Sequence, residues 1–306
     1  TRRSRIETNC WRFASGAVEP GSMSFPAIIR EEMRIEARTL PDRLEHCVME
    51  WPVMQLNRDA FLFTTPRGTR FHYARGKGIA IAQGDDGSTE ETDLFYNGTV
   101  YGAVAWLNGL VPLHASSVVM GGRIVAFTGD SGEGKSTLAA ALGRYGFAHR
   151  SDDVLLLQFA DDGILAWPDR NRIKLCEDAF AMTGARALSP IEPGAAKYFA
   201  ELLEAEKSDL ETKGGQPLPL TDLIVLQTWD RDEPMLEPCT GASKLPCIVK
   251  AMYRIEIAIA LQDEARYRRD LMSLGTGLRV WTLNRRRDRG SFESDLPRIV
   301  DQLSRL

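Results

Sequence analysis

The stretch Gly129–Ser136, with the sequence GDSGEGKS, limits the possible folds of this chain more than any other feature. It matches the pattern G-x-x-x-x-G-K-[ST], in which small residues let successive backbone N–H groups turn inward around a phosphate group. An apolar segment, residues 123–128, precedes it, and an Ala- and Leu-rich segment, residues 136–146, follows it. A strand, a glycine-rich loop and a helix N-terminus in this order predict an α/β fold that binds a nucleoside triphosphate.

The residues of this loop have separate predicted roles. Lys135 would bring a mobile positive charge to the β- and γ-phosphates, and the Ser136 hydroxyl would ligate Mg²⁺. We therefore expect ATP and Mg²⁺ as the cofactors. The candidate nucleotide-binding residues are Gly129, Asp130, Ser131, Gly132, Glu133, Gly134, Lys135, Ser136 and Thr137.

An adjacent pair of acids, Asp152–Asp153, helps to choose among the classes of protein that share such a loop. A switch or motor protein usually has a carboxylate at the end of a long buried strand, and the one tempting candidate, Asp230, is poorly spaced after its apolar run. The Asp152–Asp153 pair instead directly follows a predicted short strand just after the loop helix. One carboxylate could hold Mg²⁺ while the other takes a proton from an attacking hydroxyl. The alternative is an Asp pair in a surface turn.

Two further features lie near this pattern in the sequence. His114 begins the pair of predicted strands that leads into the loop. There it could tune the pKa of a carboxylate or contact a phosphate. The alternative is a purely structural residue. Arg170, Arg172 and Lys174 alternate as on one face of a strand. These cations could stabilise phosphoryl oxygens or bind an acidic substrate. The alternative is an exposed basic face of a strand.

Taken together, His114, the loop and the Asp152–Asp153 pair make residues 113–157 resemble the HPr kinase/phosphorylase superfamily, in particular the HPr-kinase-like serine kinases of bacterial gene clusters. The resemblance implies a P-loop kinase core related to phosphoenolpyruvate carboxykinase. It also implies that Asp152 is the catalytic base, that Asp153 is a Mg²⁺ ligand and that His114 assists.

The resemblance has a limit that bears on the substrate. The bifunctional members carry a glutamate-rich signature that helps to recognise HPr, and residues 166–180 stand in its place here. Members associated with lasso peptides phosphorylate the C-terminal serine of a peptide precursor. The resemblance therefore implies a serine kinase that acts on a peptide or protein. A kinase of a free small molecule, such as serine or a sugar, and a regulatory nucleotide-binding module without transfer remain alternatives.

The rest of the chain predicts a division into two parts. Residues 1–95 form a β-rich N-terminal region, and residues 96–306 form the catalytic domain. A buried helix is expected over residues 92–110. The polar segment 189–219 is expected to form a lid with a short helix near residues 196–206. A closing helix is expected to begin with Ser294 or Asp295 as its N-cap.

Composition excludes several classes of function. A chain of 306 residues with 43% hydrophobic and 26% charged residues is typical of a soluble globular protein. Its net charge of −4 gives no basic field for nucleic acid, and it has no apolar run long enough for a membrane span. The five scattered cysteines and the absence of a signal-peptide pattern predict a reduced, cytoplasmic protein. A homo-oligomer is compatible with this sequence.

Overall fold

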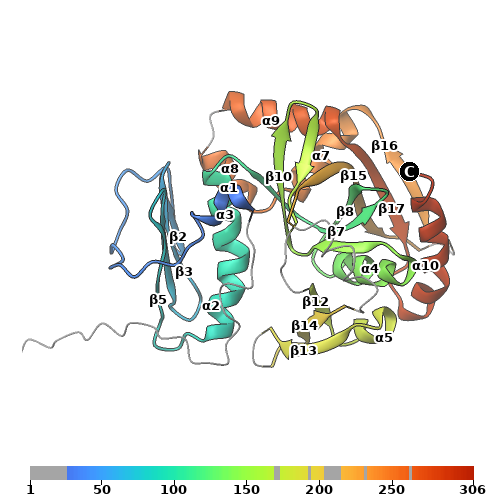
Figure 1. Cartoon of the computed structure of the whole chain (residues 1–306), viewed down its shortest axis with the longest axis horizontal. Coiled ribbons are helices and arrows are strands. Elements are labelled where there is room, and N and C mark those ends of the chain that lie inside the picture. The colour runs from blue at the N-terminus through green and yellow to red at the C-terminus, as the bar shows by residue number, and fades with distance from the viewer. Residues whose placement is uncertain (1–25, 169–172, 192–193, 203–214, 231–232, 262–263) are drawn as a thin grey trace, which may run out of the picture.

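Three β-sheets organise the chain in the computed structural model, which describes residues 26–168, 173–191, 194–202, 215–230, 233–261 and 264–306 (Figure 1). The first is an antiparallel sheet of five strands in chain order, preceded by the short helix α1 (Ala27–Arg30). Its strands are β1 (Met49–Trp51), β2 (Met54–Leu56), β3 (Ala60–Thr64), β4 (Arg70–Ala74) and β5 (Gly78–Ala82). Phe71 and Tyr73 alternate with polar neighbours along β4 and are fully buried, because successive side chains of a strand point to opposite faces.

A long helix follows this sheet, in agreement with the helix predicted over residues 92–110. It consists of α2 (Thr89–Phe95), one π-helical turn η2 (Tyr96–Val100) and α3 (Tyr101–Leu107). Its N-cap is Ser88, whose hydroxyl oxygen accepts a hydrogen bond from the Glu91 backbone N–H at 3.1 Å. The helix lies between the N-terminal sheet and the rest of the molecule, and its apolar residues share one core with both (Figure 1). The predicted boundary after residue 95 falls inside this helix.

The largest sheet contains nine strands and carries the glycine-rich loop. Its strands are β6 (Val111–His114), β7 (Ser116–Met120), β8 (Arg123–Thr128), β9 (Ala148–Ser151), β10 (Val154–Ala160), β11 (Gly163–Ala166), β15 (Leu218–Thr228), β16 (Met235–Cys239) and β17 (Arg279–Arg285). Strands β8, β15 and β17 run parallel, and β15 lies between the other two.

Strand order explains how distant residues meet at one edge of this sheet. Strand β9 is antiparallel to β7, which is antiparallel to β8, so β9 and β8 run in the same direction. Ser151 of β9 and Ala126 of β8 both lie opposite Ser117. The residues that follow β9 and β8 therefore emerge at the same edge.

Helices cover both faces of the parallel strands. Helices α4 (Lys135–Leu142) and α10 (Arg289–Leu303) pack on one face, where Phe127 contacts the core cluster that contains Leu138 and Leu296. The other face is covered by α7 (Lys244–Ala251), α8 (Ile255–Leu261) and α9 (Glu264–Gly277). Two short 3₁₀ turns lie at helix ends. The turn η3 (Gly143–Tyr145) follows α4, and η5 (Gly241–Ser243) precedes α7. Within the described ranges, no helix combines the length and apolar character needed to span a membrane.

A third, small sheet corrects one prediction. It consists of β12 (Ile173–Cys176), β14 (Lys197–Glu201) and β13 (Arg186–Pro190), with α5 (Ala179–Thr183) beside it. The helix predicted near residues 196–206 is wrong, because residues 197–201 form the central strand and pair with a neighbour on each side. Residues 203–214 of the predicted lid lie outside the described residues.

The start of the last helix corrects another prediction. Helix α10 begins at Arg289, and its N-cap is Asp288, whose Oδ1 accepts a hydrogen bond from the Ser291 backbone N–H at 2.8 Å. Ser294 and Asp295 lie inside the helix. Asp288 has the extended backbone that an N-cap requires, which residue type alone does not reveal.

Candidate active site

The glycine-rich loop lies between β8 and α4, as predicted, and its backbone depends on glycine. Gly132 and Gly134 have φ angles of 85° and 76°, which side chains other than glycine rarely adopt. A side chain at Gly129 would also approach the Leu226 carbonyl oxygen to 3.0 Å. The loop leads directly into α4, so the positive N-terminal end of the helix lies at the loop.

Lys135, the first residue of α4, is 8% exposed and bends back toward the loop. Its ammonium group donates hydrogen bonds to the carbonyl oxygens of Gly129 (3.0 Å) and Asp130 (3.2 Å). Burial lowers the pKa of Lys135, while the negative charges of Asp152 and Asp153 act in the opposite direction. The lysine charge therefore lies between the loop and the acid pair.

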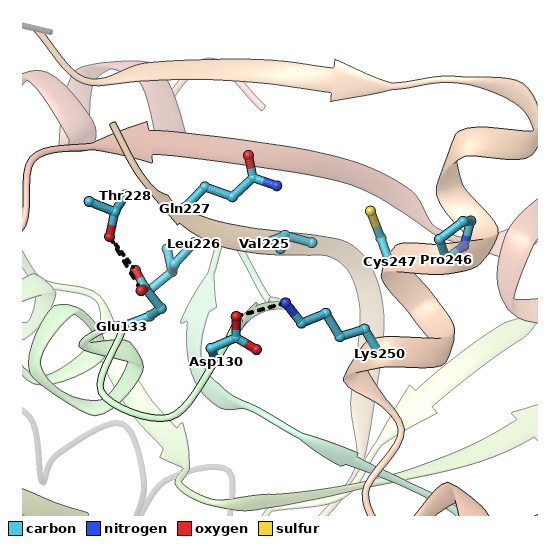
Figure 2. Close-up of a pocket in the computed structure, with 9 residues that line it drawn as sticks. All are labelled: Asp130, Glu133, Val225, Leu226, Gln227, Thr228, Pro246, Cys247 and Lys250. Atoms are coloured by element: carbon cyan, nitrogen blue, oxygen red, sulfur yellow. Dashed lines mark hydrogen bonds and ion pairs between the residues drawn. The ribbon is translucent and has the colours of Figure 1, made fainter. Parts of the chain in front are cut away.

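The outer side of the loop is held by charged residues from other elements. Lys250 of α7 forms an ion pair with Asp130, with 2.8 Å between Nζ and Oδ2 (Figure 2). Thr228 at the end of β15 donates a hydrogen bond to Glu133 at 3.1 Å. The guanidinium of Arg285, at the end of β17, donates to the Glu133 carbonyl oxygen. Asp130, Glu133, Thr228 and Lys250 border a cavity of about 400 Å³ between the loop, β15 and α7.

Asp152 is buried and both of its carboxylate oxygens are engaged. Oδ1 accepts a hydrogen bond from the Ser116 hydroxyl at 2.6 Å, and Oδ2 accepts one from the Lys174 backbone N–H at 3.0 Å. The Ser116 hydroxyl oxygen is in turn 3.5 Å from the Ser136 hydroxyl oxygen. Asp152 is thus connected to the residue of the loop that is predicted to ligate Mg²⁺.

Asp153 points to a different set of partners. Its Oδ2 lies 2.8 Å from Lys174 Nζ, and its Oδ1 lies 3.4 Å from His114 Nδ1. Its φ angle is 76°, an uncommon left-handed value for a residue other than glycine, and this turn separates the two carboxylates. Burial alone would raise the pKa of Asp153, but Lys174, with His114 and Lys197, lowers it below its ordinary value.

His114 ends β6, which pairs with β10 so that His114 lies opposite Val154. Burial lowers the pKa of His114, and the charge of Lys135 lowers it further, while the two aspartates act in the opposite direction. The imidazole ring stacks on the ring of Tyr253, with 5.9 Å between centroids and 24° between planes. The histidine therefore lies between an acid and an aromatic ring.

The structure brings most of the predicted site residues together. His114, Lys135, Ser136, the acid pair and Lys174 gather at one edge of the large sheet. Arg170 and Arg172 lie outside the described residues. Sequence reasoning missed Ser116, Tyr253, Lys197 and Lys250. Only Ser116 had a signal, because it stands two residues after His114 on the way to the loop.

The residues at this edge suit Mg²⁺, although the described residues form no protein cage for a metal. Among the described residues, no group of three or more His, Cys, Asp or Glu side chains could hold a metal ion. Mg²⁺ in nucleotide sites is usually held by one or two protein oxygens together with substrate phosphates and water. The Ser136 hydroxyl and the Asp152 carboxylate supply oxygens of this type.

Comparisons with known proteins add little to this description. No protein-family model matches the sequence, and no curated protein matches it. Among solved structures, the HPr(Ser) kinase/phosphatase from Coxiella burnetii is similar at 15% identity, with 63% of this chain and 93% of that chain covered and a TM-score of 0.32. This score is too low to support any statement about function, which must come from the site itself.

Proposed function

We propose that this chain is a Mg²⁺-dependent kinase that transfers the γ-phosphoryl group of ATP to a hydroxyl group, with a serine of a peptide or protein as acceptor. One observation carries the proposal. Two adjacent aspartates emerge beside the glycine-rich loop, and one of them is connected to Ser136 while the other is held by Lys174 and His114. A protein that only binds nucleotide has no need for the second carboxylate.

The nucleotide side of the site follows from the loop. Backbone N–H groups of the loop and the N-terminus of α4 would bind the phosphates, and Lys135 would turn from the loop carbonyls to the β- and γ-phosphate oxygens. Ser136 and Asp152 would hold Mg²⁺. When bound, Mg²⁺ neutralises negative charge on the phosphate oxygens.

We assign the role of base to Asp153, which exchanges the roles that the resemblance implies for the two aspartates. Asp152 is 2% exposed, and each of its oxygens already accepts a hydrogen bond. The Asp153 side chain is 26% exposed, so an acceptor hydroxyl can reach it. A general base must lie within hydrogen-bonding distance of the proton that it takes.

The reaction then balances as follows. The acceptor hydroxyl gives its proton to Asp153, and its oxygen forms a bond to the γ-phosphorus. The bond between the γ-phosphorus and the oxygen that bridges to the β-phosphate breaks, and ADP leaves. Lys135 stabilises negative charge on the phosphate oxygens. Lys174 keeps Asp153 ionised and in place before the proton is transferred.

The test is transfer of labelled phosphate from ATP by the wild-type chain and by Asp153→Asn, Asp152→Asn and Lys135→Ala. We expect Asp153→Asn to bind MgATP normally and to lose roughly 10²- to 10⁴-fold in transfer rate, the usual range for a general base. Asp152→Asn should instead weaken Mg²⁺-dependent ATP binding. The opposite outcome would restore the roles implied by the resemblance. In that outcome Asp153→Asn transfers phosphate at an unchanged rate, while Asp152→Asn binds ATP normally and transfers none.

The acceptor class is tested in the same assay with three sets of substrates. Serine-containing peptides and proteins from the host form the first set, and free serine and sugars form the second and third. Labelled peptide or protein supports the proposal, whereas labelled serine or sugar makes the chain a kinase of small molecules. A wild-type chain that binds MgATP and labels none of them is a nucleotide-binding module, and the kinase proposal is then wrong.

A further inference from the structure

Tyr253 connects the acid pair to the helix α2–η2–α3, for which the sequence indicated no role in the site. Its ring stacks on His114, while its hydroxyl lies beside Gly98 and Thr99 in the π-helical turn η2. The neighbouring Arg254 donates a hydrogen bond to the Thr99 hydroxyl at 3.1 Å and has an uncommon φ angle of 51°. The face of the ring therefore contacts His114, and its hydroxyl end contacts the turn η2.

The backbone of Tyr253 is anchored on the same strand as His114. Its N–H donates a hydrogen bond to the Pro112 carbonyl oxygen at 2.9 Å, and Met252 forms a β-bridge with Leu113. The Tyr253 carbonyl oxygen accepts a hydrogen bond from the indole N–H of Trp106 in α3 at 2.8 Å. Strand β6, which ends at His114, and the helix α2–η2–α3 thus both fix the position of this residue.

The helix also leaves room for the ring through two glycines. A Cβ atom at Gly102 would lie 2.6 Å from Cδ1 of Tyr253, and one at Gly98 would lie 3.3 Å from its hydroxyl oxygen. A contact of 2.6 Å is shorter than real Cβ atoms tolerate, so only glycine at position 102 admits the ring where it is. The π turn itself is a rare conformation that occurs frequently at functional sites.

We propose that Tyr253 is a positioning residue that holds the His114 imidazole against Asp153, and that η2 and Gly102 form its seat. This inference rests on the proposed function, because the position of His114 matters for catalysis only if Asp153 is the base. His114 reaches Asp153 at 3.4 Å from one side while Tyr253 covers the ring from its face. The helix beside the N-terminal sheet is in this way a part of the phosphotransfer site.

The charged groups around His114 show why its position needs support. Lys135 and Lys197 repel a protonated imidazole, and Asp152 and Asp153 attract it. Burial lowers the pKa of the ring below its ordinary value, and the contact to Asp153 is long, at 3.4 Å. A stacked aromatic ring fixes the plane of such a group without adding charge.

The experiment has a structural readout that does not depend on activity. The chain has four histidines, so its histidine ring signals in an NMR spectrum can be assigned, with His114→Asn identifying His114. The ring current of Tyr253 should shift the His114 signal. We expect Tyr253→Leu to move that signal and leave the other histidine signals in place, whereas Tyr253→Phe keeps it near its wild-type position. A His114 signal that Tyr253→Leu does not move overturns the proposal.

Kinetics on the same variants test the catalytic consequence. We expect Tyr253→Leu to lower kcat for transfer by roughly 10- to 100-fold with an unchanged KM for MgATP, since misplacement by about 1 Å can cost that much. Tyr253→Phe should restore kcat, because the ring and not the hydroxyl contacts His114. A wild-type kcat in Tyr253→Leu overturns the proposal. If wild type itself transfers no phosphate, the proposed function fails, while the NMR result still decides whether Tyr253 positions His114.

Two more variants separate positioning from stability. Gly102→Ala should displace the ring without changing any residue of the acid site, and should reproduce both the NMR shift and the loss of kcat. Tyr73→Leu removes a tyrosine that is fully buried in the N-terminal sheet. It should lower the Tm and leave the His114 signal and kcat unchanged. A loss of kcat in Tyr73→Leu equal to that in Tyr253→Leu would make the effect one of stability and overturn the proposal.

Discussion

At the scale of single residues, the ion pair between Asp153 and Lys174 is the main electrostatic feature of the site. Lys174 is only 5% exposed, and both its burial and its ion-pair partner shift its pKa. Burial by itself would lower the pKa of Lys174, but the contact with Asp153 raises it above its ordinary value. Each charge is therefore stable in the folded protein only while the other is present.

This pair predicts a pH dependence of stability. Burial alone would raise the pKa of Asp153, but Lys174 lowers it below the ordinary value of 3.8. The stability that the ionised carboxylate contributes is thus fully present above pH 3.8 and is lost as the pH falls through the lowered pKa. We expect the difference in free energy of unfolding between wild type and Asp153→Asn to shrink over that range. Urea unfolding at neutral and acidic pH measures it, and a difference that grows toward acid would contradict it.

A second prediction at the residue scale concerns the cysteines, which are scattered along the sequence. Cys239 of β16 lies beside Cys247 of α7, and burial together with this neighbour raises the pKa of Cys239 to about 11. Cys176 is exposed and serves as the comparison. Because only the thiolate reacts, Cys239 should be alkylated far more slowly than Cys176 at neutral pH. Peptide mapping after timed alkylation measures both rates, and equal rates would contradict the contact.

At the scale of secondary-structure elements, helix ends and turns decide where the site residues emerge. The Gly121–Gly122 turn, with φ angles of 57° and 81°, lets β7 return directly as β8. The left-handed residue Asp153 lies between β9 and β10, which run in the same direction and pair with β7 and β6. These two short connections place Ser116, the loop and the acid pair at one edge of the sheet.

The start of α10 gives a prediction at this scale. Asp288 accepts the hydrogen bond from Ser291, so Asp288→Ala should lower the Tm by removing the cap. Ser294→Ala, at the position expected from sequence, lies inside the helix and should change the Tm much less. Thermal unfolding followed by circular dichroism compares the two variants. A larger loss in Ser294→Ala would show that the helix begins later than in the structure.

At the scale of the whole molecule, a buried carboxylate ties the parallel strands together at the end opposite the loop. Asp222 of β15 is fully buried, and it forms ion pairs with Arg123 of β8 and Arg279 of β17. The indole N–H of Trp281 also donates a hydrogen bond to it at 2.8 Å. The three strands that carry the loop and its support are thereby held in register.

This cluster predicts a large effect on stability. Asp222→Ala would leave two arginines without their carboxylate, and removal of one partner from a buried ion pair typically costs about 3–5 kcal/mol. Asp301 of α10, which forms an exposed ion pair with Arg305, is the control. Its replacement by alanine should cost about 0–1 kcal/mol, as for an exposed pair. Urea unfolding measures both, and a small effect of Asp222→Ala would show that the cluster is not essential.

The sequence by itself determined the parts of the site that depend on neighbours along the chain. The glycine-rich loop, Lys135 and Ser136 could be predicted because a phosphate-binding turn needs particular residues at consecutive positions. The strand before the loop and the helix after it follow from the local pattern, and the structure contains both of them. The resemblance to HPr-kinase-like enzymes, and the catalytic roles it implies, stay predictions.

Only the tertiary structure decided which distant residues complete the site. Lys174 meets Asp153 through the small sheet, Ser116 joins Asp152 to Ser136, and Tyr253 stacks on His114 from the far end of α7. Apart from the position of Ser116 near His114, the sequence gives no signal for these contacts, because strand pairing brings together residues that lie far apart in the chain. The same reason explains the strand at residues 197–201, whose partners on both sides outweigh its local preference for helix.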